Sequence, residues 1–279
     1  MNDLKTYIIN VSGKNIDSFF QNLITNDINK LKKANILYTA LLSPQGKFMN
    51  DFFIIKRNES FLIECSINKA DDLINNFKKY DLRNDVNFAI ENKYATKVIM
   101  FDKLNKNLKD KFIKNNFYET EKFICFLDPR LKNYLARFWF KSDKSIDNDL
   151  NYSKYEEIEP VRIRFKIPNS EKDLLENKSF ILNYNFEKIN AISFEKGCFI
   201  GQENTARQKY RGTQKYSLKA IELLDGVFLE NNADIYIDQK KVGTMKSSFK
   251  NLGLCLFRND VKLNKLRVIT DNNMSFRFI

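Results

Sequence analysis

The chain of 279 residues contains no histidine. This absence excludes a Ser-His-Asp or Cys-His catalytic arrangement and a histidine-ligated zinc or non-haem iron site. It also removes the side chain that most often acts as a base near neutral pH. Any chemistry must therefore come from carboxylates, thiols, amines, backbone amides or a bound cofactor.

Glycine and proline are scarce, with 8 and 4 residues. These counts exclude collagen-like and Gly/Pro-rich disordered classes. Long apolar runs are also missing, because the longest ones, such as residues 52–55 and 123–127, are far shorter than the roughly 20 residues of a membrane-spanning helix. The first residues lack the apolar core and cleavage site of a signal peptide. We therefore expect a cytoplasmic protein that makes no contact with a membrane.

Cysteine is sparse as well, and its spacing is wide. The four residues are Cys65, Cys125, Cys198 and Cys255, and no two of them form a CxxC pair. A zinc or iron-sulfur site needs several such ligands close together. We therefore expect no self-contained metal site.

Charge is unevenly distributed along the chain. The formal net charge is +12, and residues 207–279 hold 14 Lys plus Arg against 7 Asp plus Glu. Five basic residues follow one another there with no acid between them: Arg207, Lys209, Arg211, Lys215 and Lys219. Codon bias toward Lys, Asn and Ile explains part of the excess. The cluster is a solvated face or a surface for an anion or nucleic acid.

The order of patterns predicts an α+β protein. Residues 16–24 carry apolar side chains at helical spacing, and the segments that follow read as an antiparallel meander with further helices. A helix is expected over residues 156–165. Beyond residue 207, short strands alternate with turn residues, which favours a small β-barrel or sandwich. We therefore predict domains at residues 1–206 and 207–279.

One segment, residues 196–207, reads K-G-C-F-I-G-Q-E-N-T-A-R. Gly197 and Gly201 permit a positive φ or a close backbone approach on either side of the Cys198 thiol. Lys196 and the amides of such a turn would stabilise a thiolate, the reactive form of cysteine. The alternative is that Cys198 is a small buried apolar residue between ordinary turn glycines.

This string resembles the signature of the YgfZ family, K-G-C-[YF]-[ITV]-G-Q-E-x-x-A-R. That family comprises folate-binding, iron-sulfur-associated relatives of the glycine-cleavage T protein, an aminomethyltransferase. Further segments resemble family motifs: residues 19–28 resemble F-L-Q-x-L-x-T-N-D-[IV], residues 42–53 resemble L-x-P-Q-G-K and a strand, residues 80–83 resemble Y-x-[LI]-R, and residues 128–130 resemble D-P-R.

The resemblance implies both a fold and a function. The fold would be that of the T protein, with interlocked α+β domains around a central folate channel and a C-terminal β-barrel. The function would be that of a folate-linked accessory factor for assembly or repair of 4Fe-4S clusters in client enzymes, including radical enzymes that thiolate tRNA. Its partners would be iron-sulfur client enzymes or assembly proteins. Nucleic acid would be involved only indirectly, and the protein would be a monomer.

The resemblance also assigns roles to residues. Cys198 would be the reactive group. Tetrahydrofolate or a derivative would be bound by Lys196, Gly197, Gly201, Gln202, Glu203, Arg207, Lys209, Arg211, Asn26 and Asn50. In an extended stretch, Arg207, Lys209 and Arg211 would share one face and could meet the anionic glutamate tail. Gln202 and Glu203 would alternatively brace the loop by bonding its own amides.

One departure separates this chain from the T protein. That enzyme carries adjacent carboxylates in the strand after the glycine turn, whereas this chain has Asn50 and Asp51. An amide cannot take up a proton as a general base does, so aminomethyl transfer is disfavoured. Arg164 aligns with the glutamate that binds the pterin in the T protein. Two alternatives stay open: a folate-dependent aminomethyltransferase, and an RNA-binding protein that uses the basic C-terminal quarter.

Overall fold

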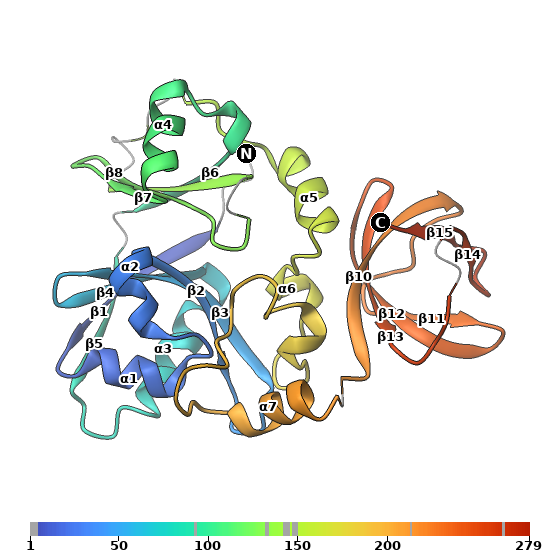
Figure 1. Ribbon diagram of the computed structural model, residues 1–279, viewed down its shortest axis with the longest axis horizontal. Helices are drawn as coiled ribbons and strands as arrows, with labels where there is room; N and C mark the ends of the chain where they lie inside the picture. Colours follow the sequence, from blue (N-terminus) through green and yellow to red (C-terminus); the bar gives the residue numbers. More distant parts are fainter. Residues whose placement is uncertain are drawn as a thin grey trace. The chain divides into compact units, whose positions relative to one another are not determined.

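A computed structural model describes residues 5–91, 94–131, 134–141, 146, 150–212, 214–263 and 266–279 (Figure 1). The chain forms two compact units that alternate along the sequence. Unit 1 comprises Met1–Leu41, Asn50–Tyr155 and Asn190–Ile200, and unit 2 comprises Leu42–Met49, Glu156–Ile189 and Gly201–Ile279. The boundary at residue 207 stays a prediction.

The larger sheet of unit 1 has five strands in the order β2-β3-β4-β1-β5. β1 runs antiparallel to both β4 and β5, so that Ile9 lies opposite Ile63 on one side and Ile90 on the other. The strands are β1 (Thr6–Gly13), β2 (Ile36–Leu42), β3 (Phe48–Arg57), β4 (Ser60–Ser66) and β5 (Val86–Glu91).

Two helices cover one face of this sheet, α1 (Ile16–Leu23) and α3 (Ala70–Lys78) (Figure 1). Phe20 of α1 meets Phe61 of β4 edge to face, with ring centroids 5.3 Å apart. Phe77 of α3 meets Phe52 of β3 in the same way at 5.6 Å, and Phe20 at 5.2 Å. Edge-to-face pairs add to the free energy of burial, so these rings fix both helices on the sheet.

A second sheet lies in the same unit, with the strand order β6-β9-β8-β7. Its strands are β6 (Ala95–Met100), β7 (Phe117–Glu119), β8 (Phe123–Leu127) and β9 (Leu135–Phe140), and helix α4 (Lys106–Lys114) packs on it through Leu108 and Phe112. The remaining short helices of the unit are η1 (Ile28–Lys30), α2 (Leu31–Ala34), η2 (Ile67–Lys69) and η3 (Phe101–Lys103).

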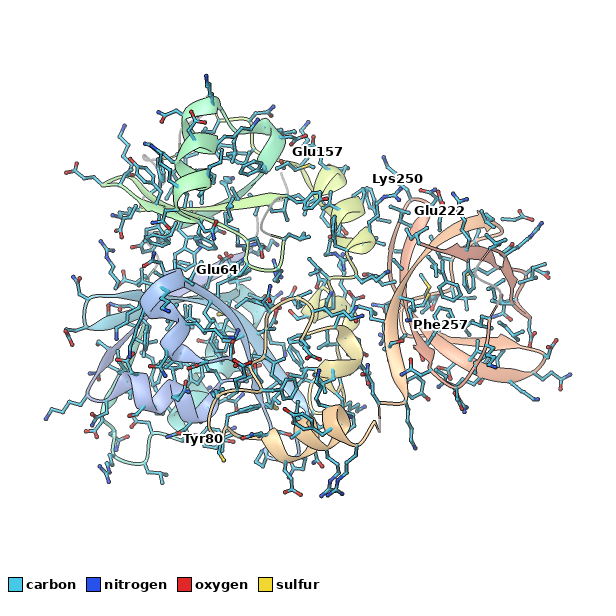
Figure 2. All side chains as sticks on the ribbon, in the orientation of Figure 1. Glu64, Tyr80, Glu157, Glu222, Lys250 and Phe257 are labelled. Atoms are coloured by element: carbon cyan, nitrogen blue, oxygen red, sulfur yellow. The ribbon has the colours of Figure 1, made fainter. Side chains whose placement is uncertain are left out.

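A buried polar cluster joins the two sheets of unit 1. Glu64 of β4, which is 1% exposed and labelled in Figure 2, forms an ion pair with Arg137 of β9. Its other oxygen accepts a hydrogen bond of 2.6 Å from the indole of Trp139. The guanidinium also lies 4.4 Å from the ring of Phe53. The buried carboxylate is therefore compensated by charge and by hydrogen bonds.

Unit 2 contains a six-stranded sheet with the order β11-β12-β13-β10-β15-β14. Its strands are β10 (Tyr216–Asp225), β11 (Asp234–Ile237), β12 (Lys240–Phe249), β13 (Leu252–Arg258), β14 (Val268–Ile269) and β15 (Ser275–Phe278). The two edges approach each other, since the amide of Asp271 donates to the carbonyl of Tyr236 over 3.0 Å. The sheet is thus nearly closed around apolar residues such as Phe257 (Figure 2), which confirms the predicted barrel.

The helices of unit 2 are α5 (Tyr155–Arg164), α6 (Ser170–Asp173), η5 (Ile181–Tyr184) and α7 (Gln202–Tyr210). The helix predicted at residues 156–165 is therefore present. Arg162 ties α5 to its surroundings, because its guanidinium bonds Glu159 at 2.7 Å, Asp173 at 3.2 Å and the Ser247 hydroxyl at 2.8 Å. In the described part of the chain, no helix is long and apolar enough to cross a membrane.

Candidate functional site

The loop that carries Cys198 is hydrogen-bonded to the end of α1 within unit 1. The amide of Ser193 donates to the carbonyl of Thr25 over 3.0 Å, and the Thr25 hydroxyl donates to the carbonyl of Ala191 over 2.7 Å. The amide of Ile200 donates to the carbonyl of Asn22 over 3.1 Å. Two segments that resemble family motifs, residues 19–28 and 196–207, thus meet in space.

Lys196 is the main anchor of this loop. Its side chain is buried, and Nζ donates to the carbonyl oxygens of Gln21 at 2.5 Å, Ile24 at 2.7 Å and Asn26 at 3.0 Å. Burial lowers the pKa of Lys196 to about 8, so the ammonium form still dominates at neutral pH. An ammonium has three protons to donate, and all three have acceptors here. Lys196 therefore holds the loop and has no donor left for the Cys198 thiol.

Cys198 is exposed, whereas the other three cysteines are buried. Burial raises the pKa of Cys65 and Cys125 to about 12 and also raises that of Cys255. The thiolate is the reactive form, so the buried thiols are inert near neutral pH. The reading of Cys198 as a buried apolar residue is therefore wrong. Nowhere in the described ranges do three His, Cys, Asp or Glu residues gather as metal ligands.

The two glycines of the motif differ in their surroundings. Gly201 has φ +80°, and a Cβ built on it would lie 2.5 Å from the carbonyl oxygen of Ser43 and 2.9 Å from the Cα of Gly46. Only glycine fits there. Gly197 lies outside the positive-φ region, and a Cβ on it would meet nothing within 4 Å. The predicted conformational need is confirmed for Gly201 and is wrong for Gly197.

Helix α7 begins directly after Gly201 and is tied to the turn at residues 43–46, all within unit 2. The Asn204 side chain donates to the carbonyl of Gln45 over 2.8 Å, and the Thr205 hydroxyl donates to the carbonyl of Gly201 over 3.1 Å. The half-buried Gln202 lies in the first turn of the helix.

The basic residues after the loop do not lie on an extended strand, so the expectation that they share one face is wrong. Arg207 and Lys209 lie in α7, where residues two positions apart point to different sides, and Arg211 is the C-cap. Arg207 forms an ion pair of 2.7 Å with Glu203, and Lys209 pairs with Glu187. Glu203 is exposed and pairs along the helix, which gives it a role other than bracing the loop amides.

Asn26 has a structural position at the base of the loop. Its side-chain Nδ2 donates to the backbone carbonyls of Tyr38 at 2.9 Å and Asn190 at 2.6 Å. Its side-chain oxygen accepts from the amide of Asp27 and from Lys30, both at 3.0 Å. The side chain is 1% exposed and fully hydrogen-bonded, so it braces the same loop as Lys196.

Asn50 of β3 differs from Asn26 in lacking such partners. It is 2% exposed, and its Nδ2 atom donates no hydrogen bond within the described residues. The neighbouring Asp51 accepts a hydrogen bond from the hydroxyl of Tyr38. A buried donor without a partner is costly, and a polar ligand atom would satisfy it. Arg164, which aligns with the pterin-binding glutamate of the T protein, is exposed on α5 in unit 2.

A half-buried arginine that sequence reasoning left unassigned lies beside Tyr38. Arg130 bonds Asp128 at 2.9 and 2.7 Å and places its guanidinium 4.7 Å from the ring of Tyr38. Burial alone would raise the pKa of Asp128, but Arg130 and Arg137 lower it below the ordinary value. The match of residues 128–130 to the D-P-R motif was the sequence signal that could have pointed to this pair.

Comparison with known proteins shows what the chain resembles. A family model described as the GCVT N-terminal domain matches residues 3–100. The "Iron-sulfur cluster assembly factor IBA57 homolog, mitochondrial" of Neurospora crassa is 29% identical over 241 residues, which cover 81% of this chain and 54% of that protein. The "tRNA-modifying protein YgfZ" of Blochmanniella pennsylvanica is 23% identical over 289 residues, which cover 94% of this chain and 82% of that protein.

The chain is a relative of the YgfZ proteins. It spans a little over half the length of the IBA57 relatives, from 54% to 58% for three of them. The crystal structure of glycine cleavage system aminomethyltransferase T from Bartonella henselae matches with a TM-score of 0.73 at 10% identity, and covers 99% of this chain and 83% of that one. This match confirms the predicted T-protein-like fold. Residues 196–207, which resemble the YgfZ signature, form the anchored segment that exposes Cys198.

Proposed function

We propose that the protein is a folate-linked accessory factor that assembles or repairs 4Fe-4S clusters in client enzymes, with Cys198 as its reactive group. The name of the IBA57 relative supports a role in iron-sulfur cluster assembly, and the name of the YgfZ relative supports a link to tRNA modification. The observation that carries the role of Cys198 is its exposure on a loop fixed by the buried Lys196. A fixed thiol loses little conformational entropy when it meets a partner.

Cys198 would act as one ligand or as one exchanging thiol, and the cluster is cargo. Within the described ranges no group of His, Cys, Asp and Glu surrounds it. A 4Fe-4S cluster takes about four thiolate ligands. The other ligands would therefore come from a client enzyme or an assembly protein, or Cys198 would instead exchange with a client disulfide.

Folate use is the second part of the proposal. The unpartnered Nδ2 of Asn50 fits a pterin, whose ring nitrogens and carbonyl oxygen accept hydrogen bonds. Lys196, Arg207 and Lys209 already have partners in the protein, so they fit the glutamate tail less well than their charge predicts. When bound, a reduced folate supplies one-carbon units or reducing equivalents. The chain would orient it through the Asn50 amide.

Several finer features belong to the same proposal. The clients would include radical enzymes that thiolate tRNA, so contact with nucleic acid would be indirect. The protein would act in the cytoplasm as a monomer. Aminomethyl transfer is the less favoured alternative, because Asn50 offers an amide where a base would be needed. Transfer of a one-carbon unit from an aminomethyl-lipoyl donor would reverse this ranking.

The deciding experiment is complementation of a strain that lacks its own YgfZ protein, with the activity of a 4Fe-4S enzyme as the readout. Wild type should restore activity, and Cys198→Ser should not. Cys125→Ala serves as the control, since it removes a buried thiol from the core. Protein levels are matched by immunoblot. Full rescue by Cys198→Ser would remove the thiol from the proposal, and failure of wild type would refute the cluster role.

A further inference from the structure

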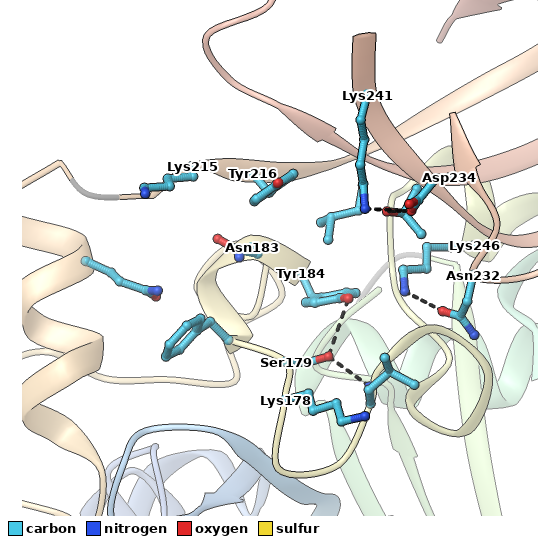
Figure 3. A pocket seen from close by; sticks show the side chains of 15 residues that line it. Lys178, Ser179, Asn183, Tyr184, Lys215, Tyr216, Asn232, Asp234, Lys241 and Lys246 are labelled. Carbon is cyan, nitrogen blue, oxygen red and sulfur yellow. Dashed lines mark hydrogen bonds and ion pairs between the residues drawn. The ribbon is translucent and has the colours of Figure 1, made fainter. Parts of the chain in front are cut away.

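A cavity of about 580 Å³ lies within unit 2, between residues 175–184 and the barrel-shaped sheet (Figure 3). This volume is in the range of sites for small molecules, roughly 300 to 1,000 Å³. The lining is basic and aromatic, with four lysines, one aspartate and three aromatic rings. The aspartate, Asp234, is already paired with Lys241 at 2.7 Å.

Lys246 of β12 is the most informative residue of this cavity. It is 3% exposed, and its Nζ donates to the side-chain oxygen of Asn232 over 2.7 Å. No carboxylate of the described residues lies within ion-pair distance of it. Asp173 acts on it only as a charge at longer range, and is itself bonded to Arg162 and to the amide of Ser247. Burial accordingly lowers the pKa of Lys246.

A buried ammonium that has only a neutral amide as its partner is costly. A bound anion would compensate it. Lys246 points toward the same space as Tyr184, whose ring centroid lies 5.7 Å from Nζ (Figure 3). The cavity therefore presents a cation and an aromatic ring to one ligand.

The rest of the lining extends this chemistry. Tyr216 of β10 is half-buried and offers a second ring, and the exposed Lys215 offers a second ammonium. Asn183 also lines the cavity, and its buried Oδ1 accepts no hydrogen bond within the described residues. A ligand with an amino or ring N–H group would supply the missing donor.

We propose that this cavity binds an aromatic anion, a planar heterocycle that carries a phosphate or carboxylate group, with the anion at Lys246 and the ring beside Tyr184 and Tyr216. A nucleotide and a reduced folate share this chemistry. The inference goes beyond the proposed function, because neither Asn50 nor the Cys198 loop is among the residues that line this cavity.

The test is calorimetric titration of the purified full chain with ATP and with 5-formyltetrahydrofolate. Tripolyphosphate and adenosine serve as partial probes that carry only the anion or only the ring. At least one complete probe should bind saturably, and it should bind at least about tenfold more tightly than either partial probe, since one charged hydrogen bond contributes that much.

Variants locate the binding. Lys246→Met should weaken binding at least about tenfold without lowering the melting temperature, because it removes an unpaired buried charge. Lys215→Gln, at an exposed position, should weaken it about threefold and carries the test if Lys246→Met fails to fold. Lys240→Gln is the control, an exposed lysine of β12 outside the lining, and should change nothing.

Binding of ATP that depends on Lys246 identifies a nucleotide site, and the same dependence with 5-formyltetrahydrofolate identifies a folate site. Either result supports the proposal. No binding of either probe up to about 1 mM, the weak end of ordinary affinities, overturns it. Binding that Lys246→Met and Lys215→Gln leave unchanged lies elsewhere and overturns it too. Equal affinity for tripolyphosphate and ATP would refute the proposed contact of the ligand's ring with Tyr184 and Tyr216.

Discussion

Gly46 and Gly201 face each other within unit 2, so closely that a Cβ on Gly46 would lie 2.9 Å from the carbonyl oxygen of Gly201. The S-P-Q-G turn and the I-G-Q-E turn therefore pack backbone against backbone. Both glycines also have a positive φ, +75° and +80°. The first half of the YgfZ signature is anchored by Lys196 in unit 1, and the second half by this glycine pair in unit 2.

Gly201→Ala should lower the free energy of unfolding by about 2 kcal/mol or more, through a strained φ and a clash with the Ser43 carbonyl. Urea unfolding measures the change. Gly197→Ala is the matched control, because its Cβ meets nothing within 4 Å, and it should cost less than about 0.5 kcal/mol. Equal costs for the two variants would contradict the packing described here.

Lys196→Met should lower the free energy of unfolding by about 2 to 4 kcal/mol, because three carbonyl oxygens would lose their donor. The variant loop should also become a site of proteolytic cleavage. Denaturant unfolding and limited chymotrypsin digestion, which cleaves after Phe194 and Phe199 of the loop, provide the two readouts. Lys188→Met, at an exposed position, should behave as wild type. An unchanged stability for Lys196→Met would show that the loop is held by other contacts.

Thiol titration with an aromatic disulfide reagent should detect one fast-reacting cysteine in the native chain and four after denaturation, since three of the four are buried. Cys198→Ser should abolish the fast reaction. Raising the pH from about 7 to 9 should not make Cys65 or Cys125 react fast, because their pKa is about 12 and few of these thiols lose their proton. A second fast thiol in the native state would contradict the burial pattern.

Asp128→Asn should lower the free energy of unfolding at pH 7 by about 3 kcal/mol, since Arg130 loses its carboxylate partner and Arg137 keeps only Glu64. The folded pKa of Asp128 lies below its unfolded value. Its contribution is therefore complete above about pH 4 and is lost as the pH falls through the folded pKa. The difference from wild type should shrink in acid. Parallel curves at pH 7, 5 and 3 would refute this role, and Asp102→Asn at an exposed position is the control.

Periodicity predicted the elements that bury an apolar face. Helix α1 lies within the predicted residues 16–24, and five of the six strands of the barrel-shaped sheet fall where short apolar runs meet turn residues. The sixth, β15, was not predicted. These elements are visible in sequence because burial imposes a spacing on neighbouring residues.

Helix α7 could not be predicted in the same way. Among Gln202–Tyr210 only Thr205 is buried, so the segment carries almost no apolar pattern. Its start is fixed by contacts of Gly201 and Asn204 with the turn at residues 43–46, over 150 positions earlier in the chain. The role of Lys196 was hidden for the same reason, because its acceptor Ile24 lies 172 positions away.

Trp139, the only tryptophan, lies in unit 1 with its indole N–H bonded to Glu64. Its fluorescence therefore reports the unfolding of unit 1. It does not report the unfolding of the barrel-shaped sheet, which contains no tryptophan. If the two units melt separately, emission and far-ultraviolet circular dichroism will give different midpoints. The chain thus carries a built-in test of whether its two parts unfold together.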